Sequence, residues 1–232
     1  MKIKFFILLF FTSIFYFSGC DSFENSSGDL FEGIVEYDIT YVATDSNNTM
    51  LEVMPSQMIC YYKDDKTKLT MSGAMGLFKL SVVTSLKQQN SVQMVKILNK
   101  KMKHTSLSKE EIEKFLEKEF KVLEIKKSGK SRNIAGLNAD EFVLKINDGT
   151  ERELLFYSAD SLKFDKPYWC SPFPEVDNIL LEYYFSKYDI KMKLTASKII
   201  RRKLADAEFE IPEDYNEVSQ EELDEMLQKF KI

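Results

Sequence analysis

A single cysteine, Cys20, stands where an apolar segment gives way to polar residues. Lys2 and Lys4 precede the almost wholly apolar residues 5–17, and two small residues separate that run from the cysteine. A membrane-spanning helix needs about 20 apolar residues, whereas an export signal needs only roughly 7–15, so the run predicts an export signal. A thiol flanked by small residues is an accessible nucleophile, suited to forming a thioether.

The stretch Phe17-Ser18-Gly19-Cys20 resembles a bacterial lipobox, in which the cysteine is diacylated before the signal is cut. This resemblance implies lipidation of Cys20 and makes the membrane a partner through that residue. Each buried CH₂ of an acyl chain contributes about 0.8 kcal/mol, so two or three chains anchor a protein durably. The alternative is a free cysteine after an ordinary or uncleaved signal.

The remaining sequence predicts a polar tether and one domain. Without residues 1–19 the chain has 30 basic and 37 acidic side chains, a net charge of −7. Because phosphate binding needs a basic surface, this balance argues against nucleic acid or anionic lipid head groups as partners. Residues 20–29 are too polar to fold alone, and no Pro/Gly/Ser-rich linker interrupts residues 30–232. We therefore expect a signal peptide over 1–19, a tether over 20–29 and a single domain over 30–232.

Two further cysteines, Cys60 and Cys170, are candidates for a disulfide, since an exported protein meets oxidising conditions. A bridge between them would close a long loop and stabilise the fold by about 3–5 kcal/mol on the chain-entropy model. Cys60 follows Met58-Ile59 in a core-like strand, so an ordinary buried thiol is the alternative. Cys170 lies in a proline- and aromatic-rich stretch that we expect to form a rigid loop at the rim of a barrel.

Other reactive residue types form no catalytic pattern. The only histidine, His104, stands among lysines, which make it a poor metal ligand and predict a surface position. Spacings typical of metal ligands or of a nucleophile elbow are absent, and Asp64-Asp65 belongs to a predicted turn. We therefore predict a protein that is not an enzyme and uses no metal or cofactor.

The elements that must position any site are mostly strands with period-two alternation. From Phe31 to Tyr41, apolar residues alternate with Glu36, Asp38 and Thr40, which predicts a strand with one face in the core and one in water. Two turns are expected, at Asp64-Asp65 and at Asp148-Gly149. Similar patterns predict further strands over 58–62, 67–71, 77–84, 92–98, 122–125, 142–146, 152–157, 179–185 and 190–197.

Two amphipathic helices interrupt the strands. Each begins with a capping box, Ser108-Lys109-Glu110-Glu111 or Ser219-Gln220-Glu221-Glu222, and continues with an apolar stripe. A long antiparallel sheet with two such helices predicts an α+β fold, in which a curved sheet of about nine to eleven strands is covered by the helices.

Five segments resemble, in this order, those of Bacteroidetes outer-membrane lipoproteins related to the half-barrel of the lipoprotein carriers LolA and LolB. They are FEGIVEYDITY (31–41), YYKDDKTKLTM (61–71), RNIAGLNADEFVLK (132–145), LLFYSADSL (154–162) and FEIPEDYNEVS (209–219). The resemblance implies an unclosed barrel with a helical lid around an apolar cavity that holds acyl chains. Leu137 and Ala139 stand where that family has tyrosine and cysteine.

Such a cavity predicts two groups of ligand-binding residues. The strand face of the first segment would supply the wall, formed by Phe31, Val35, Tyr37, Ile39 and Tyr41. The alternative is that these side chains fill the core. The stretch MSGAMGLF would place Met75, Leu77 and Phe78 at an apolar hairpin tip that touches membrane or cargo, as a loop of LolB does; a buried bulged strand is the alternative.

Two functions remain open at this point. One is a lipid-anchored envelope protein that binds a lipid, acyl chain, lipoprotein or other hydrophobic ligand. The other is a non-enzymatic envelope scaffold or accessory subunit with a filled core that docks another envelope protein. Asp21, after the predicted lipidation site, resembles an inner-membrane retention signal of enterobacteria, but it also resembles a surface-export tag of Bacteroidetes. We favour the outer membrane, facing the periplasm or the cell surface. Asp160-Ser161-Leu162 resembles the O-glycosylation triplet of the same bacteria.

Overall fold

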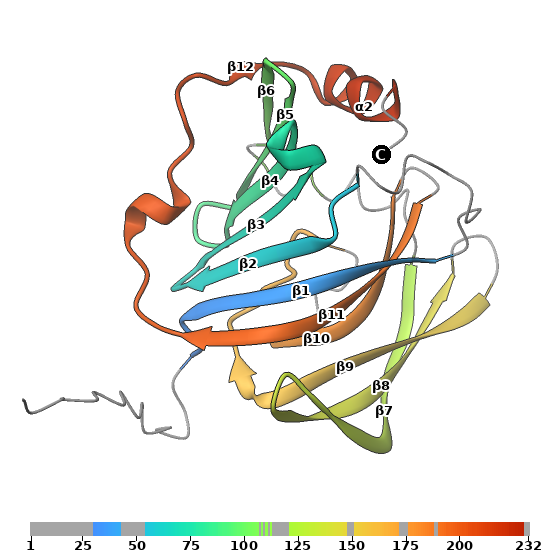
Figure 1. Ribbon diagram of the computed structural model, residues 1–232. Coiled ribbons are helices and arrows are strands. Elements are labelled where there is room, and N and C mark those ends of the chain that lie inside the picture. The colour runs from blue at the N-terminus through green and yellow to red at the C-terminus, as the bar shows by residue number, and fades with distance from the viewer. Residues whose placement is uncertain are drawn as a thin grey trace, which may run out of the picture.

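One open, strongly curved sheet of twelve strands dominates the computed structural model (Figure 1). The structure describes residues 30–42, 54–106, 108, 110, 112, 121–147, 151–171, 176–187 and 190–229. The strands are β1 (Gly33–Val42), β2 (Gln57–Lys63), β3 (Lys66–Gly73), β4 (Phe78–Ser85), β5 (Asn90–Ile97), β6 (Lys100–Ser106), β7 (Lys121–Ile134), β8 (Leu137–Asn147), β9 (Glu151–Lys163), β10 (Asn178–Lys187), β11 (Ile190–Arg201) and β12 (Asn216–Glu217).

The strands form two meanders that meet at β1. Their spatial order is β12-β6-β5-β4-β3-β2-β1-β11-β10-β9-β8-β7. The pairing of β1 with β11 joins the two meanders, and it brings the start of the described chain beside its later part. Neighbouring strands are antiparallel except β12 and β6, which are parallel. The predicted antiparallel pairing of consecutive strands is therefore present, but the sheet has twelve strands instead of nine to eleven, and they form two meanders instead of one.

The alternation predicted for β1 is confirmed. Val35 and Tyr37 are fully buried, while Glu36 is half-buried and Asp38 is exposed. The predicted turn after β2 is also present, since Lys63 pairs with Lys66 and Asp64 adopts a φ of 51°. β8 and β9 pair at Asn147 and Glu151 as a hairpin requires, although residues 148–150 lie outside the described residues.

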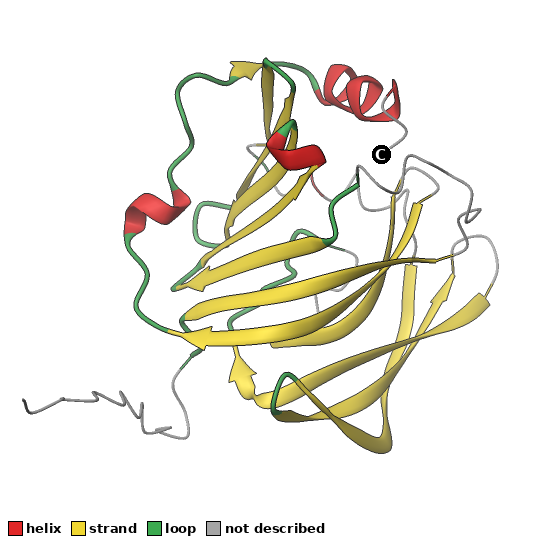
Figure 2. Ribbon diagram, in the orientation of Figure 1, coloured by secondary structure: helices red, strands yellow, loops and turns green. Residues whose placement is uncertain are grey.

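The predicted α+β class is wrong, because the fold is mostly β (Figure 2). The described residues contain one α-helix, α2 (Gln220–Lys229), and two short 3₁₀ turns, η2 (Ala74–Gly76) and η3 (Asp206–Phe209). A ten-residue helix is only about 15 Å long, so it cannot cover a sheet of this width. It packs on one corner, against Phe78, Val95 and Ile97.

The capping box predicted for α2 is confirmed. The Glu222 N–H donates to Ser219 Oγ over 3.2 Å, and the Ser219 N–H donates to Glu222 Oε2 over 2.9 Å. Of the other expected helix, over 108–120, the structure describes three positions: Glu110 and Ile112 are helical, and the Ile112 N–H donates to the Ser108 carbonyl over 3.3 Å. Local capping chemistry thus predicted where α2 begins, but not how little of the sheet it covers.

An extended segment, residues 202–218, packs on the face of β1 to β6 that points away from the main core around Val35 and Tyr37. We call this segment the strap. Leu204 and Phe209 of the strap are almost fully buried, and they pack in one cluster with Ile34, Val83 and Met94. We had expected this face to meet water. That expectation is wrong here, because the outward-facing residues include several large apolar side chains that the strap buries.

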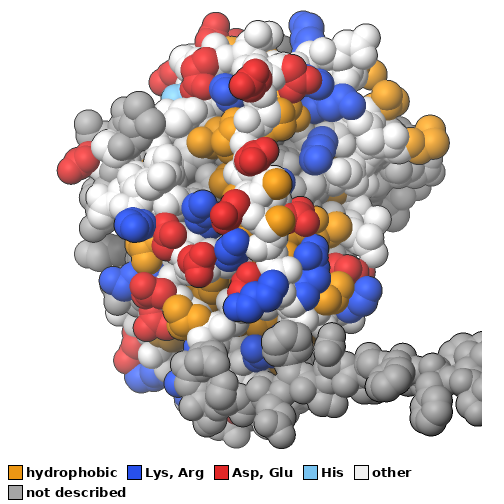
Figure 3. All heavy atoms as spheres, turned by 90° about the vertical axis from the view of Figure 1, so that its left-hand side faces the viewer, with side chains coloured by type: hydrophobic (Ala, Val, Ile, Leu, Met, Phe, Trp, Pro, Cys, Tyr) orange, Lys and Arg blue, Asp and Glu red, His pale blue; other side chains and the backbone are white. Residues whose placement is uncertain are grey.

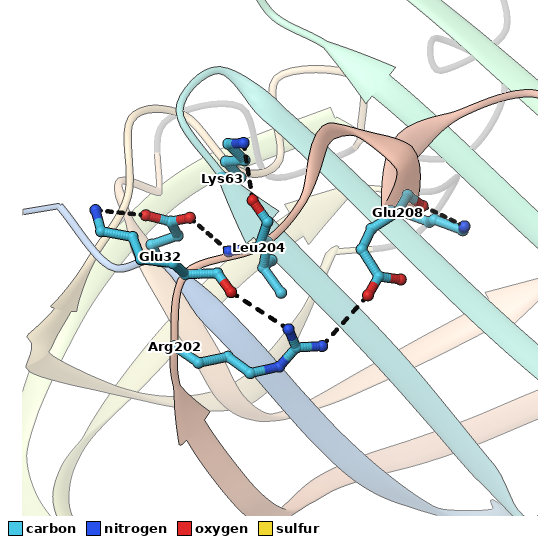
Figure 4. A network of polar contacts seen from close by, with 7 residues as sticks. Glu32, Lys63, Arg202, Leu204 and Glu208 are labelled. Carbon is cyan, nitrogen blue, oxygen red and sulfur yellow. Dashed lines mark hydrogen bonds and ion pairs between the residues drawn. The ribbon is translucent and has the colours of Figure 1, made fainter. Parts of the chain in front are cut away.

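Ion pairs and backbone hydrogen bonds fasten the strap to the sheet (Figure 4). Lys63 Nζ donates to the Leu204 carbonyl and to Asp206 Oδ1, each over 2.8 Å. Glu32 Oε1 accepts the Leu204 N–H over 2.7 Å, and the Glu32 carbonyl accepts the Arg202 N–H over 3.3 Å. Acidic and basic side chains are intermingled on this side of the molecule (Figure 3).

Candidate functional site

A pocket of about 780 Å³ lies at the end of the sheet that carries β7, β8 and β9. The sheet strands supply one wall, and the connection between β9 and β10 supplies another. Leu30, directly before β1, completes the lining. The lining residues are Leu30, Ile125, Phe142, Phe156, Ser158, Lys163, Phe164, Asp165, Val176, Asp177 and Asn178.

Aromatic side chains form the apolar part of the pocket. Phe142 and Phe156 face each other across β8 and β9 as a stacked pair, with ring centroids 5.1 Å apart and planes 3° from parallel. Phe164 is buried and meets the Tyr62 ring edge to face at 5.3 Å. These rings make a rigid apolar surface that accepts hydrocarbon without needing specific polar partners.

Backbone hydrogen bonds hold the separate segments around the pocket. The Phe31 N–H donates to the Lys163 carbonyl over 2.7 Å, which fixes Leu30 beside the end of β9. The Phe164 N–H donates to the Asp177 carbonyl over 3.0 Å, which joins the two sides of the connection between β9 and β10. The pocket is therefore a product of the tertiary fold.

Charged residues lie at the mouth of the pocket. Lys163, Asp165 and Asp177 are exposed, and Asn178 is half-buried with its amide donating to Asp160 Oδ1 over 3.3 Å. The pocket thus combines an apolar interior with a polar entrance, an arrangement typical of sites for small amphipathic ligands.

The residues predicted to form the cavity wall fill the main core instead of lining this pocket. Phe31, Val35, Tyr37 and Ile39 are buried together, and Tyr41 packs against them with its hydroxyl donating to the Pro55 carbonyl over 2.5 Å. Their contact with a ligand stays a prediction. Their burial matches the alternative that aromatic residues at strand spacing form the core.

Buried tyrosines lie between the core and the pocket. Tyr37 Oη donates to the Leu180 carbonyl over 2.7 Å, and the Leu180 N–H donates to Tyr168 Oη over 2.8 Å. The Tyr183 ring meets both Tyr37 and Tyr168 edge to face. Burial raises the pKa of Tyr37 and of Tyr168 above the ordinary range, so both phenols stay neutral at physiological pH. These hydrogen bonds and ring contacts indicate a structural role for the three tyrosines.

The predicted apolar tip splits into an exposed part and a buried part. Met75 and Leu77 are exposed at 102% and 49%, whereas Phe78 is buried beneath α2. Leu98, in the turn between β5 and β6, is 55% exposed, and its N–H donates to the Leu77 carbonyl over 2.7 Å. Sequence reasoning missed Leu98, since only strand pairing brings the two turns together. By register, this tip lies at the opposite end of the strands from Leu30.

The predicted disulfide is absent from the structure, in which Cys60 and Cys170 are both free thiols. Cys60 is buried on the core face of β2, opposite Val35. Burial raises the pKa of each thiol to about 12, which leaves little reactive thiolate at neutral pH. The structure thus favours the alternative of an ordinary buried thiol for Cys60, while Cys170 is half-buried.

A cluster of buried charges, which the sequence did not reveal, ties five strands together. Glu182 pairs with Arg132 and accepts a hydrogen bond from Thr195 over 2.8 Å. Glu141 accepts hydrogen bonds from Tyr157 and Ser128, and these bonds lower the pKa of its carboxyl group. The Arg132 guanidinium lies 4.3 Å from the Tyr157 ring centroid. Because these partners satisfy both carboxylates, we assign the cluster a structural role.

His104 joins β6 to the chain that leads into α2, with Nδ1 at 3.0 Å from the Val218 carbonyl, which fixes the proton on that nitrogen. It is half-buried, so the predicted surface position is only partly correct.

Among the described residues, no group of three His, Cys, Asp or Glu side chains could hold a metal ion. In the same part of the chain, no helix has the length and apolar character needed to cross a bilayer.

Cys20 and Asp21 lie outside the described residues, so lipidation and the export tag stay predictions. Asp160 and Ser161 of the glycosylation triplet are exposed on β9, while Leu162 is buried.

A scan of the chain against protein-family models gives no match, and a search of curated proteins gives none either. The resemblance to Bacteroidetes lipoproteins therefore stays a prediction that depends on the five segments alone.

Proposed function

We propose that this protein is a non-enzymatic, lipid-anchored protein of the bacterial cell envelope that holds a lipid acyl chain or similar hydrophobic ligand in the pocket beside β7, β8 and β9. The observation that carries the proposal is the pocket itself. Its volume of about 780 Å³ is within the range of small-molecule sites, and six of its lining residues are apolar.

The proposed anchor supports the same function. Leu30 lines the pocket, and Cys20 lies only ten residues before it. A ten-residue segment spans at most about 35 Å when fully extended. An acylated Cys20 would therefore keep the pocket within a short distance of the membrane surface, which we expect to be the outer membrane.

Filling the pocket tests the ligand-binding part of this proposal. The full-length chain is extracted from membranes in a non-ionic detergent, and co-purifying lipids are identified by mass spectrometry. We expect bound lipid in the natural protein and much less in Ile125→Trp, whose indole would occupy the pocket. Leu123→Trp is the matched control, because Leu123 lies on the same strand and is 40% exposed. Equal lipid content in Ile125→Trp and the natural protein, or none in either, would refute a ligand role for the pocket.

Radiolabelled palmitate tests the anchor separately. We expect the label to enter the full-length chain and to be lost in Cys20→Ala, which should also leave the membrane fraction. Equal labelling of both forms would contradict lipidation at this residue, whatever the pocket binds.

The exposed tip favours a second candidate, an envelope scaffold that docks another protein. Met75, Leu77 and Leu98 place three apolar side chains on two adjoining turns at the far end of the strands from Leu30. A photo-crosslinker at position 75 would link a scaffold to one specific envelope protein in cells. Absence of such a product, together with co-purifying lipid, favours the ligand-binding function.

A further inference from the structure

The mouth of the pocket carries charges of both signs, and these select among hydrophobic ligands. Among the described residues that line the pocket, Lys163 is the only cation, and Asp165 and Asp177 are the only anions. All three are exposed, and none of them has an ion-pair partner within the part of the chain that the structure describes. Their charges are therefore available to a ligand head group at the entrance.

The three charges come from both sides of the mouth. Lys163 ends β9, and Asp165 follows it two residues later. Asp177 stands on the returning chain, held to the first side by the hydrogen bond between its carbonyl and the Phe164 N–H. A head group with charges of both signs can pair with all three residues, whereas one with only negative charge can pair with Lys163 alone and lies beside two carboxylates.

The apolar interior of the pocket would hold the hydrocarbon end of the ligand. The stacked pair Phe142 and Phe156, together with Ile125 and Val176, offers apolar surface and no charged side chain. A hydrocarbon chain gains free energy there in proportion to the apolar area it buries.

From these two features we infer that the ligand is a single-chain amphiphile with a zwitterionic head group, whose ammonium faces Asp165 and Asp177 and whose phosphate faces Lys163. This inference rests on the proposed function, and it makes the ligand more specific than an acyl chain of any kind. Because the mouth is open to water, each charge contributes modestly, about three- to fivefold in affinity, and the preference weakens as salt screens it.

Photo-crosslinking tests this preference in the full-length chain in non-ionic detergent. Three diazirine probes with the same C16 chain are compared: a lysophosphatidylethanolamine, a fatty acid and a monoacylglycerol, which carry zwitterionic, anionic and neutral heads. We expect the zwitterionic probe to label peptides from residues 121–147 and 151–171 most strongly and the fatty acid least. The difference should shrink at high salt.

Variants that remove charges at the mouth of the pocket test whether those residues cause the preference for the zwitterionic probe. Asp165→Asn combined with Asp177→Asn should reduce labelling by the zwitterionic probe about tenfold, if each carboxylate contributes about threefold, and should increase labelling by the fatty acid. Lys163→Gln should weaken labelling by the zwitterionic probe and by the fatty acid, and should leave the monoacylglycerol unchanged. Glu213→Gln, which removes one negative charge from the strap, is the matched control and should behave as the natural protein.

The outcomes separate the inference from the proposed function. Equal labelling by the three probes at the pocket, or preference for the fatty acid, overturns the inference while leaving a hydrophobic-ligand site. Labelling that is absent from these peptides, or unchanged by Ile125→Trp, overturns both. A zwitterionic preference that survives the double asparagine variant overturns the assignment to Asp165 and Asp177.

Discussion

The two ends of the sheet differ in how their apolar surface is covered. Beside β4 to β6, the later chain covers both faces, since the strap packs Leu204 and Phe209 on one side and α2 packs Leu223 on the other. Beside β7 to β9, a hollow remains next to Phe142 and Phe156. The strap and α2 therefore stabilise the end at β4 to β6, whereas the end at β7 to β9 keeps uncovered apolar surface that is free to contact a ligand.

Removing one large side chain from each end of the sheet should give the largest difference in stability between the two ends. Phe209→Ala leaves a cavity under the strap and should lower the free energy of unfolding by about 3–5 kcal/mol. Phe142→Ala should cost clearly less, because its ring already borders empty space. Urea unfolding followed by circular dichroism measures both. Equal losses would mean that the pocket end is packed as tightly as the strap end.

Removing a charge from the buried cluster around Glu182 should have the next largest effect on the free energy of unfolding. Glu182→Gln keeps the shape of the side chain but removes the charge that pairs with Arg132. We expect a loss of about 1–3 kcal/mol in urea unfolding, since a partly buried cation is left without its counter-charge. Glu153→Gln, at an exposed position of β9, is the control and should change little. No loss in Glu182→Gln would show that the cluster is merely a surface feature.

The attachment of the strap should weaken in acid. Its hydrogen bond and ion pair with Lys63 lower the pKa of Asp206 below 3.8, and Lys101 does the same for Asp214. A carboxyl group whose folded pKa is depressed contributes stability above its unfolded pKa, and this is lost as pH falls through the folded pKa.

Asp206→Asn tests this pH dependence. The variant should be less stable than the natural protein near neutral pH, and the difference should vanish as pH falls through the depressed pKa of Asp206. Thermal unfolding at a series of pH values measures it. A difference that persists in strong acid would assign the stabilisation to something other than the ionised pair.

Substitution at the exposed tip should have the smallest effect on stability. Met75 is fully exposed at a positive φ of 53°, so Met75→Ser should change the free energy of unfolding by less than about 0.5 kcal/mol. Met75→Gly should be neutral or stabilising, because glycine adopts this backbone conformation without strain. A large loss in either variant would show that the tip is packed against the domain.

Much of the local structure followed from the sequence. Period-two alternation predicted β1 and its buried face, the Asp64-Asp65 turn predicted the hairpin of β2 and β3, and Ser219 with Glu222 predicted the start of α2. Each of these depends on residues within a few positions of one another. The fold class was predicted wrongly, because a capping box says nothing of how much sheet its helix will cover.

The sequence by itself predicted most of the strands, the turn at Asp64-Asp65 and the start of α2, and it predicts an acylated Cys20, since these depend on local side-chain chemistry. It missed β6 and predicted only residues 122–125 of β7. Only the tertiary structure decided that Ile34 is buried under the strap, that Leu98 lies beside Leu77, and that Leu30, Phe142 and Val176 line one pocket. The reason is physical. Such contacts join residues far apart along the chain, and they depend on how the strands pair and how the sheet curves.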